Sequence, residues 1–483
     1  MKIDLFFEPE FDELYESYHN DSKKRELLKL EGISKEQLDV GRMSYNYFTG
    51  KIADMSVNQN ANANEDFSPS SYAAEIVKGI QKLEGYFLLW RYSQRKLGTE
   101  RANELIRAIW DGDIYFHDAS GVNINQPYCV AFSTQNIMLE GRPYGQLPSV
   151  PPKRADSFIA QVTETVMDLS QDFCGAIAPS DMIVNYCWYA KRENLSDYEI
   201  LNDFQKFVHV VNNKFRMGSE SPFTNISLFD RENLEKVFSD YRYPDGTKVD
   251  IDYVMHVQEL VGEWFSKGAP SGLPYRFPVT TVNISRDENG KILDERFLDW
   301  VCKTNIKKGC FNIYVNDGNK IASCCRLVND MERMQFRSDS FGNGGMNLGS
   351  HRVCTVNLPR IALRAQGNEE VFFTLLQEQL ENAMDLLYIH RNEIMKRRIE
   401  SGFLKFFKPL GWLSLDMFFS TIGEIGIYEA GYFMGYDAKT QEGQDFTEKV
   451  LMYIEDFAKE ASKKYKCSVN VEEIPKNTGA IAA

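Results

Sequence analysis

Short apolar runs that alternate with long helical stretches restrict the fold of this chain more than any other feature. Residues 222–228 and 277–284 are short, apolar and rich in β-branched side chains, which is typical of buried strands. Apolar residues recur at helical spacing over 72–110, and long helices are expected over 371–399 and 446–465. Because strands alternate with helices, the sequence predicts an α/β architecture.

The composition of the chain excludes several classes of function. With 483 residues, 43% of them hydrophobic, the chain has enough apolar side chains for a large core. Its net charge of −14 disfavours sequence-independent binding to nucleic acid. No apolar run approaches the roughly 20 residues that span a bilayer, and the N-terminus lacks the features of a signal peptide. We therefore expect a cytoplasmic protein with neither a membrane nor a nucleic-acid partner.

Cysteines are the most conspicuous candidates for chemistry. The nine cysteines include no C-x-x-C pair, so we expect free thiols and no zinc site in this chain. Cys324 and Cys325 are adjacent and precede a glycine-rich segment at 341–349, whereas Cys129 lies far away in sequence. Glycines beside a thiol let the backbone approach a ligand closely. Free cysteines also commonly fill core volume, so the residues alone leave both interpretations open.

Several motifs, taken in order, resemble the anaerobic (class III) ribonucleotide reductases. The finger-loop region of that family is matched by 323–326, by the glycine-rich loop with Asn347, and by 353–363. Four other segments match in the same order: Asn60–Asn64, Asp113–Asp118 leading to Cys129, Ser221–Asn225, and Phe418–Gly423 with Gly426 and Glu429. The matches extend over roughly residues 55–475, and their order makes the resemblance specific.

The resemblance implies a ten-stranded α/β barrel with a central finger loop, which reduces ribonucleoside triphosphates to deoxyribonucleotides. Cys325 corresponds to the thiyl radical that removes the 3′ hydrogen of the ribose. Cys129 corresponds to a thiol on the opposite face that protonates the departing 2′-hydroxyl and donates a reducing equivalent. Asn347 corresponds to an asparagine that helps to hold the sugar. The segment expected to bind substrate consists of Ser221, Pro222, Phe223, Thr224 and Asn225.

Some of these residues also have a structural interpretation. Asn347 could supply a turn, His117 and Asp118 match a structural strand end of the family, and Cys354 suits core packing. Cys324, beside the expected radical cysteine, resembles the subgroup that is reduced by a redoxin rather than by formate. Both reductants therefore remain open.

The stored radical of this family resides on a glycine in a C-terminal region that also binds zinc through four cysteines. Residues 476–483 depart from the family pattern, and Gly479 lacks the motif of the radical loop. The resemblance therefore implies a glycyl radical carried by a separate C-terminal polypeptide. A radical-SAM activase would generate it with S-adenosylmethionine and an iron–sulfur cluster. A truncated gene and an incomplete sequence remain alternatives.

The expected organisation has an N-terminal helical extension at 1–53, a catalytic barrel at 54–475 and a divergent tail at 476–483. Nucleotide effectors and a homodimer are further expectations from the family. Two other hypotheses remain: another glycyl radical enzyme with the same fold, and a non-catalytic remnant that only binds nucleotides or a partner chain. Nucleotide binding would distinguish a reductase from another glycyl radical enzyme. Turnover would distinguish a reductase from a non-catalytic remnant.

Overall fold

The computed structural model describes residues 7–49, 68–143, 147–215, 220–317, 320–322, 328–330, 347–402, 404 and 413–473. The chain divides into two compact units. Unit 1 comprises Met1–Pro127, Ser350–Leu404 and Phe418–Ala483, and unit 2 comprises Tyr128–Gly349 and Lys405–Met417. The α/β class predicted from the sequence is confirmed, while the ten-stranded barrel remains a prediction.

Unit 1 begins with helices that build much of its core. They are α1 (Pro9–Asn20), α2 (Ser22–Leu30), α3 (Val40–Phe48), α5 (Pro69–Leu97), α6 (Thr99–Trp110) and α7 (Ser120–Asn123). The side chains of Phe11 and Tyr18, in the region expected as an extension, are fully buried and pack against Trp110. Gly98, with φ of 92°, separates α5 from α6.

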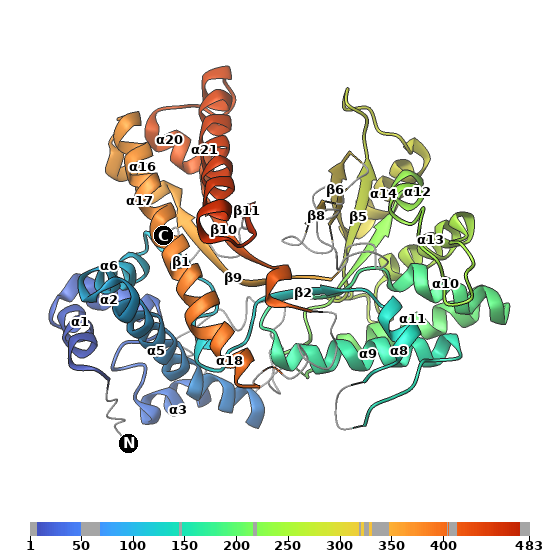
Figure 1. Cartoon of the computed structure of the whole chain (residues 1–483), viewed down its shortest axis with the longest axis horizontal. Coiled ribbons are helices and arrows are strands. Elements are labelled where there is room, and N and C mark those ends of the chain that lie inside the picture. The colour runs from blue at the N-terminus through green and yellow to red at the C-terminus, as the bar shows by residue number, and fades with distance from the viewer. Residues whose placement is uncertain are drawn as a thin grey trace. The chain divides into compact units, whose positions relative to one another are not determined.

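The remaining elements of unit 1 form a small mixed sheet with its covering helices. They are β1 (Ile114–Phe116), β9 (Leu348–Asn357), α16 (Leu358–Ala365), α17 (Glu369–Tyr388), η1 (Ile389–Met395), α18 (Lys396–Glu400), β10 (Phe418–Ile425), α20 (Ile427–Met434), α21 (Gln441–Tyr465) and β11 (Val469–Glu473). The order is β11-β10-β9, with β1 antiparallel to β9 and β11 parallel to β10. Helices α17 and α21 pack against β10 and β11, respectively (Figure 1). The expected helix at 371–399 contains a π-helical segment, η1.

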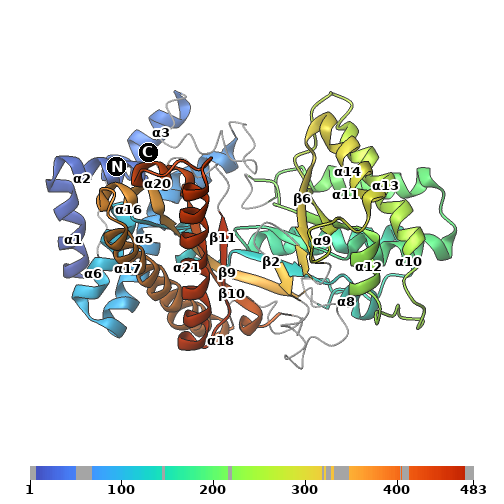
Figure 2. The same cartoon turned by 90° about the horizontal axis from the view of Figure 1, so that it is seen from above.

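Unit 2 alternates strands and helices. Its elements are β2 (Cys129–Phe132), α8 (Gln135–Glu140), α9 (Ala155–Asp172), β3 (Ile177–Pro179), α10 (Met182–Glu193), α11 (Asp197–Val211), β4 (Asn225–Phe229), α12 (Arg231–Val237), α13 (Ile251–Lys267), β5 (Val279–Ser285), α14 (Glu295–Lys308), β6 (Phe311–Asn316), β7 (Lys320–Ala322), β8 (Val328–Asp330) and η2 (Leu415–Met417). Both strands expected from the apolar runs are present, as β4 and β5. Helix α12 packs against β4 and β5, and α13 packs against α12 and α14; Figure 2 labels these three helices and β6.

Parallel pairing positions the candidate site in unit 2. Strand β2 pairs with β3, and β4 pairs with β5, which pairs with β6. A parallel bridge between Ile177 and Thr224 links β3 to the start of β4. The amino ends of β2, β3 and β4 therefore lie at the same edge.

Candidate active site

The shared edge of β2, β3 and β4 brings together two predictions made from distant parts of the sequence. Val130 pairs with Ile177, which bridges in turn to Thr224. Neighbouring strands lie about 4.8 Å apart, so this register places Cys129 about 10 Å from the 221–225 segment. The predicted thiol and the predicted substrate-binding segment therefore meet at one edge of unit 2.

Cys129 is the first residue of β2 and only 1% exposed. Its sulfur accepts a hydrogen bond from the backbone N–H of Ala176, with a distance of 3.1 Å from nitrogen to sulfur. The neighbouring N–H of Gly175 donates to the carbonyl of Tyr128 over 2.6 Å. The thiol is thus held by backbone on the adjoining strand.

Pairing between strands occupies part of the backbone of the 221–225 segment. The Phe223 carbonyl accepts from the N–H of Ile177, and the Thr224 carbonyl accepts from the N–H of Val279, both over 2.8 Å. The Thr224 hydroxyl donates to the Pro222 carbonyl over 2.9 Å. These two carbonyl groups therefore take part in strand pairing.

Asn225 carries a buried acceptor at this edge. Its side chain is 1% exposed, and its Nδ2 donates to the hydroxyl of Thr281 over 3.0 Å. Within the described residues, its Oδ1 has no hydrogen-bond partner. An unpaired buried amide oxygen costs about 1–3 kcal/mol, so this atom is suited to receive a hydroxyl group from a ligand.

Asn347 lies at the other end of β2. Its Oδ1 accepts from the N–H of Ser133 over 2.9 Å, and Ser133 directly follows that strand. Four residues of strand advance about 13 Å, so the structure does not place Asn347 beside Cys129. The role of Asn347 in holding the sugar stays a prediction.

A buried carboxylate holds the backbone that Asn347 contacts. Asp181 accepts from the N–H and the hydroxyl of Thr134, over 2.7 and 2.8 Å, and from the hydroxyl of Ser133. Burial raises the pKa of Asp181, while these hydrogen bonds act in the opposite direction. Asp181 thus couples the carboxyl ends of β2 and β3.

Several predicted residues lie outside the described residues. They are Cys324 and Cys325, the Asn60–Asn64 segment, most of the glycine-rich loop, and Gly479 with the tail. The roles assigned to the two adjacent cysteines therefore stay predictions. In unit 1, His117 bonds the Thr355 hydroxyl over 2.8 Å and Cys354 is fully buried, which fits their structural interpretation.

Sequence reasoning missed Gly175 and Ala176. They follow Cys174 without any spacing pattern that would connect them to Cys129. Only the parallel register of β2 and β3 brings them to the thiol. A strand-pairing prediction for the residues around Cys129 is the one signal that could have found them.

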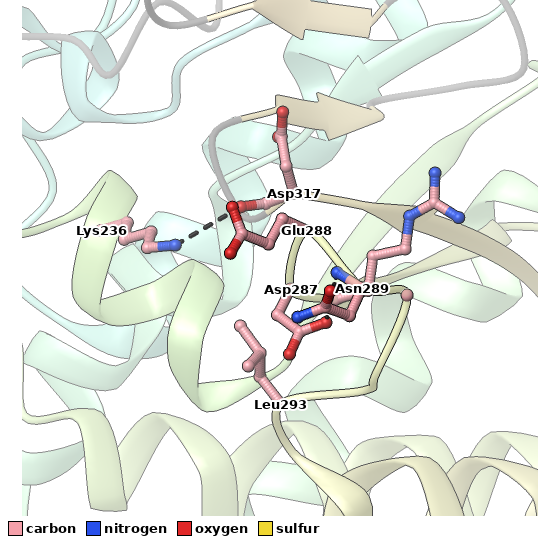
Figure 3. A pocket seen from close by; sticks show the side chains of 8 residues that line it. Lys236, Asp287, Glu288, Asn289, Leu293 and Asp317 are labelled. Atoms are coloured by element: carbon pink, nitrogen blue, oxygen red, sulfur yellow. Dashed lines mark hydrogen bonds between the residues drawn. The ribbon is translucent and has the colours of Figure 1, made fainter.

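A hollow of about 650 Å³ lies at the opposite, carboxyl ends of β5 and β6 (Figure 3). It is lined by Lys236, Arg286, Asp287, Glu288, Asn289, Gly290, Leu293 and Asp317. The ammonium of Lys236 donates to the Asp317 carbonyl over 3.4 Å. Because Cys129 and the 221–225 segment lie at the amino ends of the strands, we place the candidate site there and not in this hollow.

In the parts of the chain that the structure describes, no three His, Cys, Asp or Glu side chains gather as a metal site would require. The same residues include no helix with the length and apolar character needed to cross a membrane.

These features define an α/β protein with a buried thiol at the amino ends of parallel strands. A family model for anaerobic ribonucleoside-triphosphate reductase matches residues 88–480. A search of curated proteins found no match.

The fold is similar to solved structures of anaerobic ribonucleotide reductase from Thermotoga maritima. One, with citrate in the active site, has 28% identity and a TM-score of 0.83, covering 100% of this chain and 86% of that one. Another, in complex with dATP and CTP, has 28% identity and a TM-score of 0.81, covering 98% and 77%. The chain belongs to the anaerobic ribonucleoside-triphosphate reductase family, whose members are oxidoreductases and glycyl radical enzymes.

Proposed function

We propose that this chain binds ribonucleoside triphosphates and reduces them to deoxyribonucleoside triphosphates by thiyl radical chemistry. The observation that carries the proposal is the shared edge of Cys129 and the 221–225 segment, in a chain of this family. The residues come from distant parts of the sequence, and a sugar bound between them would meet a thiol and a polar segment together.

Asn225 is the side chain proposed to contact the sugar. Its buried Oδ1 is an acceptor, and a ribose hydroxyl is a donor that would satisfy it. Its Nδ2 is held by Thr281, which fixes the direction of the amide. The other proposed substrate-binding residues are Ser221, Pro222, Phe223 and Thr224.

Cys129 is proposed as the proton donor. Its S–H proton passes to the 2′-oxygen, which departs as water, and the sulfur keeps the electron pair as a thiolate. The family's glycyl radical supplies the oxidising equivalent that makes a thiyl radical from a thiol, for which Cys325 is proposed. Cys325 lies outside the described residues and the radical glycine is expected on a separate polypeptide, so the family resemblance supports this part of the proposal.

The proposal extends to the partners. A structure of the Thermotoga maritima enzyme holds dATP and CTP, which supports a nucleotide effector and a pyrimidine triphosphate substrate here. The expected homodimer, the radical-SAM activase and a formate or redoxin reductant are part of the same proposal, as is a cytoplasmic location.

The test is an anaerobic assay of deoxyribonucleotide formation, with activase, S-adenosylmethionine, CTP and either formate or a redoxin. It is run with the chain alone and with a separate glycine-bearing polypeptide, which decides where the radical glycine resides. Cys325→Ser should abolish product while CTP still binds, and Cys302→Ser, at an exposed cysteine on α14, should leave turnover unchanged. Absence of product in every mixture, despite a radical detected by electron paramagnetic resonance, would favour the non-catalytic remnant.

A further inference from the structure

The sulfur of Cys129 occupies space that a side chain at residue 175 would need. A Cβ added to Gly175 would lie 2.4 Å from the Cys129 sulfur and 2.6 Å from the Tyr128 carbonyl oxygen. Both distances are far shorter than the roughly 3.5–4.0 Å of favourable contacts between nonbonded heavy atoms. Any residue larger than glycine would therefore displace either the sulfur or the backbone of β2.

A backbone donor points at the same sulfur. The N–H of Ala176 is directed at the Cys129 sulfur over 3.1 Å, while the next N–H, of Ile177, bonds the Phe223 carbonyl. The Ala176 carbonyl accepts from the N–H of Val130, so the carbonyl of this residue still pairs with β2. The N–H of Ala176 is thus directed to a side chain, whereas its neighbour serves the sheet.

A hydrogen bond accepted by sulfur favours the charged form of a thiol. An N–H donor stabilises a thiolate more than a neutral S–H group, because the negative charge strengthens the bond. The contact uses the sulfur as an acceptor, and therefore does not consume the S–H hydrogen. A thiol in this setting can release its proton and then be held as an anion in the same position.

We propose that Gly175 and Ala176 are positioning residues that form a backbone socket for the Cys129 sulfur. Gly175 leaves the space into which the sulfur fits, and Ala176 directs one N–H to it. The catalytic meaning of this socket rests on the proposed function of Cys129, but the socket itself is a property of the folded chain and can be measured without turnover.

Amide hydrogen exchange of the full chain tests the hydrogen bond. In Cys129→Ala the Ala176 N–H loses its acceptor, so its exchange should accelerate at least about tenfold, as expected for one lost hydrogen bond. The exchange rate of the Ile177 amide should not change. In Cys129→Ser, which retains an acceptor, the Ala176 rate should lie between those of the wild type and Cys129→Ala. An unchanged Ala176 rate in Cys129→Ala would overturn the proposal.

A second measurement addresses the space at Gly175 and the charge of the thiol. Cysteine labelled with ¹³C at Cβ reports the titration of Cys129, whose signal is assigned by its loss in Cys129→Ser. Gly175→Ala should move the titration midpoint to higher pH by about one unit, because a hydrogen bond to an anion is lost. The control Gly431→Ala, where a Cβ would meet nothing closer than 3.9 Å, should leave it unchanged.

The outcomes separate this proposal from the proposed function. Altered exchange and titration, with no deoxyribonucleotide from any mixture, would retain the socket and reject the reductase activity. Turnover with unaltered exchange and titration would retain the activity and reject the socket. If Gly175→Ala does not fold, the exchange measurement on Cys129→Ala decides alone.

Discussion

Two buried polar clusters, one in each unit, are held in different ways. In unit 1, His351 of β9 bonds His390 of η1 through their Nδ1 atoms over 3.0 Å, and its Nε2 bonds the hydroxyl of Ser420 over 2.8 Å. In unit 2, the Cys129 sulfur accepts from the N–H of Ala176, the residue before β3. The histidine cluster consists of side chains that bond one another, whereas the thiol is bonded by a backbone N–H that is directed to it and not to a neighbouring strand.

This difference predicts different consequences of mutation. Removing a histidine breaks bonds between side chains in a fully buried setting, and leaves its partners unpaired at a cost in stability. Replacing the thiol by a hydroxyl changes little volume and keeps an acceptor for the Ala176 N–H. The comparison therefore separates a cluster expected to contribute stability from a residue proposed to contribute chemistry.

The largest expected effect is the loss of turnover in Cys129→Ser. A hydroxyl replaces the thiol with little change of volume, but it is a far weaker acid and cannot supply the reducing equivalent. We expect deoxyribonucleotide formation to fall by at least about 10²–10⁴-fold, the contribution of a general acid, with the melting temperature nearly unchanged. Persistent multiple turnovers would remove Cys129 from the mechanism. A large fall in melting temperature would show that the thiol, like the histidine cluster, contributes to stability.

The next effect is the stability lost in His351→Leu. The change removes two buried hydrogen bonds and leaves the Nδ1 atom of His390 unpaired, while Ser420 keeps only its 3.7 Å contact with the Cys467 sulfur; we expect a loss of about 2–4 kcal/mol of the unfolding free energy. Urea unfolding measures this loss. The control is His256→Leu, because His256 is half exposed and its bond is to the exposed Asp197; losing this bond should cost less than about 1 kcal/mol. Equal losses in both variants would show that the buried cluster adds no stability.

The histidine cluster also predicts a dependence of stability on pH. Burial lowers the pKa of His351, with Arg391 and Arg352 adding to it, and burial lowers that of His390, with Arg352, His351 and Arg398 adding. Below the unfolded value of about 6.5, the unfolded chain binds protons that the folded chain does not. The two histidines therefore do not reduce the free energy of unfolding above this pH, and they reduce it increasingly as the pH drops below it.

The slope should reach about 1.4 kcal/mol per pH unit for each histidine. Urea unfolding between pH 5 and pH 8 measures it, and His351→Leu should flatten the profile. A profile that is equally steep in the variant would show that other groups cause the acid sensitivity.

The smallest expected effect concerns Asp172, the last residue of α9 in unit 2. Burial raises its pKa to about 6, and the nearby Asp168 adds to the shift. The folded chain therefore holds a proton that the unfolded chain has lost between about pH 4 and pH 6, so stability falls as the pH rises through this range. Asp172→Asn should raise stability at pH 8 by no more than about 3 kcal/mol, the value of the full pKa shift, and by less to the extent that solvent screens this partly buried carboxyl.

Thermal melting at pH 5 and pH 8 measures the effect of Asp172→Asn, with a smaller gain expected at pH 5. Asp156→Asn is the matched control on the same helix. Its pKa is lowered, with burial opposing hydrogen bonds from Arg154 and Ser157. That variant should lose stability at pH 8, and a gain in both variants would point to a general effect of charge removal.

Local patterns in the sequence were sufficient for many elements of the fold. The apolar runs at 222–228 and 277–284 overlap β4 and β5, each of which ends one residue later, and the helix expected at 446–465 is the greater part of α21. The boundaries differ where capping decides them, as at Thr440, whose hydroxyl accepts from the N–H of Gly443 and starts α21 early. A π-helical segment at η1 has no signature in the apolar spacing.

The sequence by itself determined the α/β class, the family and the candidate residues, because periodicity and ordered motifs are properties of the chain as written. Tertiary structure decided which candidates meet. Parallel pairing brought Cys129 to Ala176 and to the 221–225 segment, and a side-chain hydrogen bond with Ser133 holds Asn347 at the far end of β2. The physical reason is that register between distant strands depends on long-range packing and hydrogen bonding, which no local spacing in the sequence encodes.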